Sequence, residues 1–167
     1  MIQTQLKLRL NQKKIVELEE WLLCLTRVWN WGIRKIELDA KDGIYYSKTK
    51  FQNLLANHSK KIGISSHTLQ GMLVVAWDAW NRCFKKLSKK PKLKGKRNKL
   101  NSIPFPDPIK RPNGNYIKLT SLGVLKFHKQ DIPKGKIKCG RIIRRASGWY
   151  LCLFVDAPVK PISAKAN

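Results

Sequence analysis

Apolar and polar residues alternate along the first ten positions of the chain. The residues on the apolar face are Ile2, Thr4, Leu6, Leu8 and Leu10. A period of two is typical of a strand with one buried face, so the sequence predicts a half-buried strand over residues 2–10. An isolated strand is unstable, and its candidate partners all lie after residue 103.

A long apolar stripe with helical spacing follows this strand. Asn11 can cap a helix at its start, and the Asp42-Gly43 pair breaks the pattern. The stripe recurs at spacings of three and four and consists of Ile15, Leu18, Leu22, Leu25, Trp29, Ile33 and Ile36. The sequence therefore predicts one long amphipathic helix in this region.

Two more helices are expected before the pattern changes. A short one covers residues 47–58, with Phe51 and His58 on its apolar side, and another begins at Ser65 or Ser66 with a stripe that extends to Leu87. The tryptophans expected to pack between helices are Trp29, Trp77 and Trp80. Together these segments predict a three-helix bundle.

The second half of the chain is predicted to form strands. The expected strands cover residues 116–120, 123–128, 136–145 and 149–156. Asn113-Gly114 is a tight-turn signal, and Ser147-Gly148 supplies a hairpin turn before the last strand. That last strand is apolar at nearly every position, which favours a central place in its sheet. The pattern predicts an α+β fold, a small antiparallel β-barrel with a three-helix insertion after its first strand.

These expectations divide the chain into five segments. They are the first barrel strand (residues 1–10), the helical insertion (11–88), a basic connection (89–102), the rest of the barrel (103–157) and a flexible tail (158–167).

Charge adds a second organising feature. The chain holds 35 Lys and Arg against 10 Asp and Glu, a net charge of +25. Residues 84–101, here called the basic strap, carry no acid, and Pro91 and Gly95 prevent a smooth helix there. Its cationic residues are Lys85, Lys86, Lys89, Lys90, Lys92, Lys94, Lys96, Arg97 and Lys99.

Charges this dense repel one another, and a polyanion would remove the repulsion and release counterions. Nucleic acid is the favoured partner, because no apolar run reaches the roughly 18 residues of a membrane span and no signal peptide is evident. A solvated linker or a localisation-type patch stays open as an alternative for the strap.

Catalytic chemistry is not indicated by the residues themselves. After Asp42 the carboxylates Asp78, Asp107, Asp131 and Asp156 are widely spaced, whereas a metal-dependent nuclease needs several that converge. The cysteines form no C-x-x-C pair, and Cys24, Cys83, Cys139 and Cys152 are expected to be buried, reduced thiols of an intracellular protein. The sequence predicts a binding protein without catalytic residues, metal or cofactor.

Several segments, in their order and spacing, resemble the N-terminal half of the TnpB (OrfB-type) proteins of bacterial insertion sequences, compact relatives of type V CRISPR effectors. They are VWNWGIRKIE, TLQGMLVVAWDAWNRCFKKL, KPKLKGKRNK, SIPFPD and IPKGKIKCGRIIRRASGWYLCLFVD. The resemblance implies an oligonucleotide-binding-like barrel (the wedge domain) with a helical recognition domain inserted after its first strand.

The resemblance also implies a function. Such proteins hold guide RNA and its heteroduplex with target DNA, and a following RuvC-like domain with three acidic residues cuts. This sequence matches none of that nuclease domain, so we expect guide-type RNA and transposon or target DNA as partners, no cleavage by the chain itself, and a bacterial cytoplasmic, nucleoid-associated location. A truncated regulatory binder, one subunit of a split nuclease with a separate nuclease chain, and a ribosomal-type RNA-binding protein remain alternatives.

The resemblance suggests roles for individual residues. Tyr46, His67 and Gln70 match positions that line the cleft where the motif beside the target is read, and the segment around Asp107 lies across that cleft in relatives. Prolines replace polar residues in that segment, which argues against base contacts from it. Arg141, Arg144 and Arg145 would face RNA backbone, and the basic strap would follow phosphates.

Overall fold

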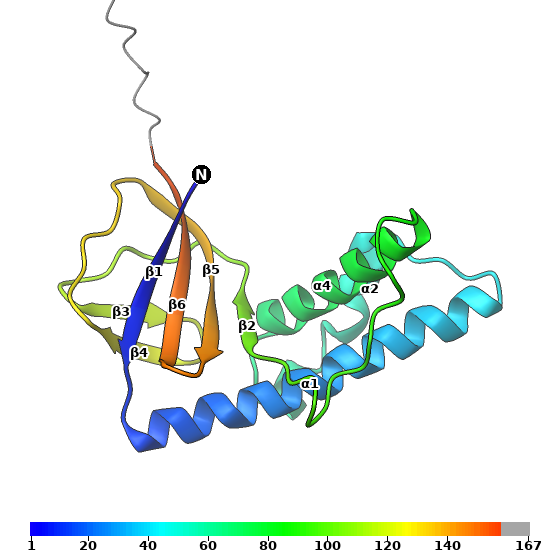
Figure 1. Cartoon of the computed structure of the whole chain (residues 1–167), viewed down its shortest axis with the longest axis horizontal. Coiled ribbons are helices and arrows are strands. Elements are labelled where there is room, and N and C mark those ends of the chain that lie inside the picture. Colours follow the sequence, from blue (N-terminus) through cyan, green and yellow to red (C-terminus); the bar gives the residue numbers. More distant parts are fainter. Residues whose placement is uncertain (158–167) are drawn as a thin grey trace, which may run out of the picture.

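The computed structural model describes residues 1–157 and shows an α+β fold (Figure 1). The chain runs β1 (Ile2–Arg9), α1 (Gln12–Lys41), α2 (Lys48–Gln52), a 3-10 turn η1 (Asn53–Leu55), α3 (Ser59–Ile62), α4 (Ser66–Phe84), β2 (Ser102–Phe105), β3 (Tyr116–Leu119), β4 (Gly123–Phe127), β5 (Lys136–Arg145) and β6 (Gly148–Asp156). The predicted class is confirmed, and the predicted tail, residues 158–167, lies outside the described residues.

One antiparallel sheet of six strands is curled into a half-barrel in the order β2-β5-β6-β1-β4-β3. β1 pairs with β6 along most of its length and with β4 at its end, as its need for partners after residue 103 predicts. β6 lies in the interior of the sheet, between β5 and β1, as its apolar sequence predicts. Gly135, at a φ of 132°, allows the chain to enter β5, because a Cβ there would lie 2.3 Å from the Asp156 carbonyl oxygen.

Strand β2 was not predicted, because its Pro104 cannot donate to a ladder. The structure places β2 at the edge of the sheet, paired only with β5, and an edge is where a strand tolerates proline.

The helices follow the predicted starts more closely than the predicted ends. The Asn11 side chain caps α1 by accepting from the Lys14 backbone N–H at 2.8 Å, and Ser47 caps α2 in the same way. The single helix predicted over residues 47–58 is wrong: this range holds α2, η1 and a turn, and α3 begins only at Ser59, because Asn53 and Asn57 favour turns over helix interior. The described chain therefore has four α-helices instead of three.

The stripe of α4 also stops earlier than predicted. The helix ends at Phe84, and Leu87, which we expected on the apolar face, is 73% exposed. His58, expected on the apolar side of its helix, is exposed as well. Of the four cysteines predicted to be buried, only Cys152 is fully buried; the other three are half-buried.

The half-barrel and the helices share one buried apolar cluster. Trp21 of α1 stacks on Phe105 of β2 with ring centroids 6.2 Å apart, and α4 packs against β2 where Gly71 meets Pro104. The predicted packing role of the tryptophans is confirmed, since Trp29 and Trp80 are buried and Trp77 is half-buried against the same cluster.

Candidate nucleic-acid interface

The basic strap lies along α1 on its way from α4 to β2 (Figure 1). The Trp29 indole N–H donates to the Lys92 carbonyl at 3.0 Å. The Asn30 amide donates to the Lys94 carbonyl at 2.9 Å and accepts from the Lys94 N–H at 2.7 Å. These three bonds hold the backbone of the strap to α1 at Lys92 and Lys94, although this part of the strap contains no helix or strand.

The far end of the strap is held by the sheet. The Arg144 N–H donates to the Asn101 carbonyl at 2.8 Å, and the Arg144 guanidinium donates to the Asn101 side chain at 3.0 Å. The same guanidinium pairs with Glu19 of α1. Arg144 therefore joins β5, α1 and the strap, and much of its hydrogen-bonding capacity is used within the protein.

The cationic side chains of the strap differ in how they are engaged. Lys90 pairs with Glu37 at 2.6 Å, and this hydrogen bond lowers the pKa of the Glu37 carboxyl. The Lys94 ammonium lies 5.4 Å from the centre of the Trp29 ring. The other seven predicted residues, all exposed, form no ion pair within the described chain: Lys85, Lys86, Lys89, Lys92, Lys96, Arg97 and Lys99. The strap thus presents a fixed row of unneutralised charge.

Tyr46 is tied to α1 and α4. Its hydroxyl donates to the Asp39 carboxylate, whose other partner, Lys35, lies at 3.0 Å. The bond from Tyr46, followed by that from Lys35, lowers the pKa of Asp39, and the same bond raises the pKa of Tyr46. The Tyr46 carbonyl accepts from the Trp77 indole at 2.8 Å.

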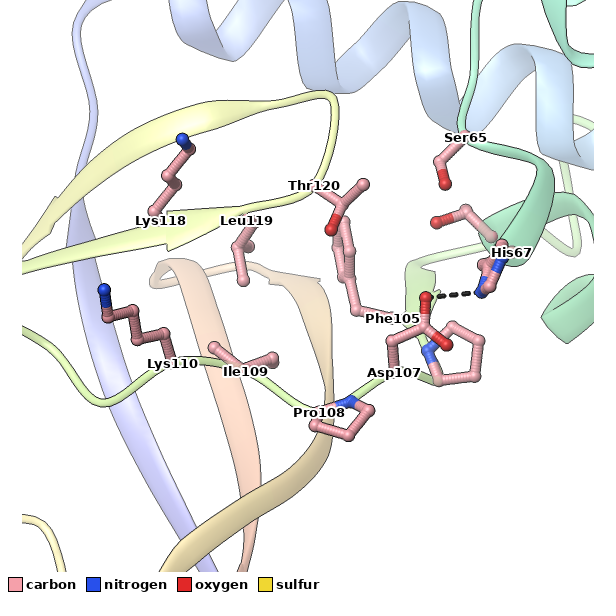
Figure 2. Close-up of a pocket in the computed structure, with 12 residues that line it drawn as sticks. Ser65, His67, Phe105, Asp107, Pro108, Ile109, Lys110, Lys118, Leu119 and Thr120 are labelled. Carbon is pink, nitrogen blue, oxygen red and sulfur yellow. Dashed lines mark ion pairs between the residues drawn. The ribbon is translucent and has the colours of Figure 1, made fainter.

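His67 lies at the other end of α4 and faces Asp107. Its Nδ1 is 2.5 Å from the Asp107 carboxylate, with both side chains about half exposed. The pair stands at the rim of a hollow of about 230 Å³ between the start of α4, the segment after β2 and the end of β3. Figure 2 shows His67 and Asp107 on one side of this hollow, and Lys110 and Lys118 on the opposite side.

The three residues predicted to line one cleft are not brought together: His67 and Gln70 belong to α4, and Tyr46 lies between α1 and α2. His67 and Gln70 are one turn apart and therefore share a face of the helix, and Gln70 is half-buried. Tyr46 contacts α4 at Trp77, which is roughly 15 Å along the helix axis from His67. The structure brings together His67 and Asp107, and leaves Tyr46 at a separate hollow with Trp77 and Trp80.

Arg141 and Arg145 project from β5 on the outer face of the half-barrel. The Arg141 guanidinium lies 6.0 Å from the centre of the Phe154 ring, and that of Arg145 lies 5.6 Å from the centre of the Tyr150 ring. Both arginines are exposed, unlike Arg144. Sequence reasoning missed the aromatic partners, although their alternation with the buried Leu151 and Leu153 could have indicated them.

Asn30 belongs to the aromatic-Asn pattern of the quoted resemblance, but its contact with the strap was not predicted. It lies in the segment VWNWGIRKIE, between Trp29 and Trp31, and an amide in the middle of an aromatic helical segment is an available signal for a polar contact.

Within residues 1–157, no three His, Cys, Asp or Glu side chains are grouped so that they could hold a metal ion. None of the helices there combines the length and apolarity needed to cross a bilayer. Burial raises the pKa of the Cys24 and Cys139 thiols.

No family model matches the chain, and no curated protein matches it. The resemblance to TnpB proteins consequently depends on the quoted segments alone, and the residue roles that it implies stay predictions.

Proposed function

We propose that this chain binds nucleic acid, holding guide-type RNA beside transposon or target DNA as the non-cleaving part of a TnpB-type system. One observation carries the proposal: the backbone of the basic strap is bound to α1 by Trp29 and Asn30, while most of its charges point to solvent without a partner. A solvated linker would not need a fixed backbone. A phosphate-binding surface benefits from a fixed backbone, because cations that are already positioned lose less conformational entropy on binding.

The proposal gives each part of the fold a role. The half-barrel is the oligonucleotide-binding-like wedge domain, and the helices between β1 and β2 are the recognition domain inserted after its first strand. This assignment is supported by the separation of β1 from its partners β6 and β4, since all four helices lie between them in the chain. His67, at the hollow that it lines together with Asp107, and Gln70, one turn further along α4, would face the DNA beside the target.

The test replaces strap lysines that have no partner. The variant Lys89→Gln, Lys92→Gln, Lys96→Gln, Lys99→Gln should bind RNA and DNA more weakly. The slope of log affinity against log salt should fall by about 3, because each lost phosphate contact removes roughly 0.7–0.9 from it. Filter binding or gel shifts at several salt concentrations measure both quantities.

The matched control removes the same charge elsewhere, with Lys60→Gln, Lys61→Gln, Lys129→Gln, Lys134→Gln, all at exposed positions. Equal losses in both variants would show that only net charge matters, which would contradict the proposal. The guide-type part is tested with RNA transcribed from the DNA that flanks the coding sequence: affinity equal to that for a shuffled RNA would sink it.

A further inference from the structure

The outer face formed by β1, β6 and β5 is not covered by a helix in the described part of the chain. The helices meet the sheet mainly at its β2 edge, and in Figure 1 they stand beside the three strands. The residues that point outward are defined by alternation with the buried ones and by register. They are Gln3, Gln5 and Lys7 of β1, Tyr150, Cys152 and Phe154 of β6, and Arg141, Ile143 and Arg145 of β5.

Cys152 lies at the centre of this face, opposite Gln5 on one side and Arg141 on the other. Tyr150 and Phe154 precede and follow it on β6, roughly 13 Å apart along the strand. Cys152 itself is only 1% exposed and accepts from the Gln3 amide at 3.7 Å, so the two partly buried rings beside it are separate surfaces. We call this surface, made by Tyr150, Phe154, Arg141, Arg145 and Gln5, the outer platform.

Each ring of the outer platform has an arginine beside it. Arg145 lies 5.6 Å from the centre of Tyr150, and Arg141 lies 6.0 Å from that of Phe154. The Tyr150 hydroxyl bonds to Ser147 at 2.7 Å, which limits movement of its ring. A guanidinium that lies close to an aromatic ring can stack on it, and nucleic-acid bases stack on guanidinium planes as well as on aromatic rings.

Two further observations indicate that a ligand belongs on this face. The side-chain nitrogen of Gln5 is buried and has no hydrogen-bond partner within the described residues, which is unusual for a buried donor. The charge is also one-sided. Lys7, Arg141 and Arg145 are exposed cations, whereas the only acid of the three strands, Asp156, lies at the end of β6 and faces Lys138 at 3.8 Å.

We propose that the outer platform binds unpaired nucleotides of single-stranded RNA by stacking their bases on Arg141–Phe154 and Arg145–Tyr150. This inference rests on the proposed function and changes the expected role of the two arginines, from contacts with phosphates to contacts with base planes. Stacking is tolerant of sequence, since every base has a π-face. A duplex, whose bases are already stacked and paired, offers no such surface.

The position of the basic strap supports this assignment. Its end at Asn101 is bonded to Arg144, the neighbour of Arg145 on β5. Arg144 and Arg145 point to opposite faces of β5, so an RNA whose phosphates follow the strap would pass the end of β5 to reach the platform.

The decisive variant is Arg141→Lys with Arg145→Lys, which keeps both charges and removes both planar groups. Its binding is compared with wild type on a labelled single-stranded 12-nucleotide RNA and on a blunt RNA duplex of the same length. Stacking contributes about 1–3 kcal/mol per base, so we expect affinity for the single strand to fall about tenfold. Affinity for the duplex should stay within about twofold of wild type, because phosphate contacts follow charge.

A second variant, Tyr150→Leu with Phe154→Leu, tests the rings, and its thermal unfolding shows whether the fold is kept. If it unfolds near the wild-type temperature, the same selective loss is expected. If it does not, the lysine variant alone decides, since its positions are exposed. An unchanged single-strand affinity, or an equal loss for both RNAs, would overturn the platform while leaving the proposed function intact. A wild-type protein that binds neither RNA at low salt would refute the proposed function itself.

Discussion

Individual polar groups on apolar helices position the connecting segments of this protein. The indoles of Trp29, Trp77 and Trp80 donate to the carbonyls of Lys92, Tyr46 and Ile33. Each ring packs against the apolar cluster while its N–H finds a backbone acceptor, as buried indoles usually do. Asn30 also positions the strap. Its side-chain amide donates to the Lys94 carbonyl through its nitrogen and accepts from the Lys94 N–H through its oxygen.

The variant Asn30→Ala should release the strap from α1. Two hydrogen bonds are lost, which we expect to lower the free energy of unfolding by about 1–2 kcal/mol. The strap is rich in trypsin sites, so its rate of tryptic cleavage should rise roughly fivefold to tenfold as local opening becomes easier. Limited proteolysis followed by mass spectrometry measures this rate. The exposed Asn57→Ala serves as control, and cleavage of Asn30→Ala at the wild-type rate would disprove the docking role.

At the scale of elements, α4 and the edge strand β2 approach each other closely, because the helix has a glycine and the strand a proline at the contact. A Cβ on Gly71 of α4 would lie 3.3 Å from the ring of Pro104 in β2 and 3.4 Å from that of Pro106. Neither ring can move aside as a flexible side chain would. Glycine on the helix and proline on the edge strand thus set the distance between α4 and the half-barrel.

Replacing Gly71 by valine should push these two elements apart. Overpacking of this kind costs about 1–3 kcal/mol of unfolding free energy, which urea denaturation monitored by tryptophan fluorescence would detect. Arg82→Val, at an exposed position of the same helix, should change stability by less than about 0.5 kcal/mol. A Gly71→Val protein as stable as wild type would mean that the α4–β2 contact is looser than these distances indicate.

At the scale of the whole molecule, repulsion among the excess positive charges destabilises the folded state. A net charge of +25 repels itself, and acidic residues offset only part of it at a few ion pairs such as Lys90–Glu37 and Arg144–Glu19. Added salt shortens the range of this repulsion to about 10 Å at 0.1 M. Salt should therefore stabilise the free protein while it weakens the protein's binding to nucleic acid.

Raising salt from about 20 mM to 200 mM should increase the midpoint of thermal unfolding by roughly 5 °C, since each kcal/mol shifts it by about 2–4 °C at this size. Circular dichroism of the protein without nucleic acid measures the shift, and a short RNA added at low salt should raise the midpoint as well. The four-fold strap glutamine variant should show a smaller salt effect. A midpoint that fell with salt would mean that attractive surface pairs outweigh the repulsion.

Local patterns were sufficient for much of the fold. The period of two over residues 2–10, the cap at Asn11 and the hairpin turn at Ser147-Gly148 are properties of neighbouring residues, and β1, α1 and the β5–β6 hairpin form where these patterns predict them. The excess of cations in the strap can also be predicted from the sequence, because it is a property of local composition.

Other features depend on residues far apart in the chain. Asn30 meets Lys94, His67 meets Asp107, and Arg144 joins Glu19 and Asn101, and no local period records such pairs. Strand β2 exists because the free edge of β5 accepts a proline-containing segment, which no propensity scale favours. The sequence determined the elements and the charge because both are set by short-range chemistry. The course of the strap and the pairing of arginines with rings on the outer face came from tertiary packing, because only the folded chain brings those groups into contact.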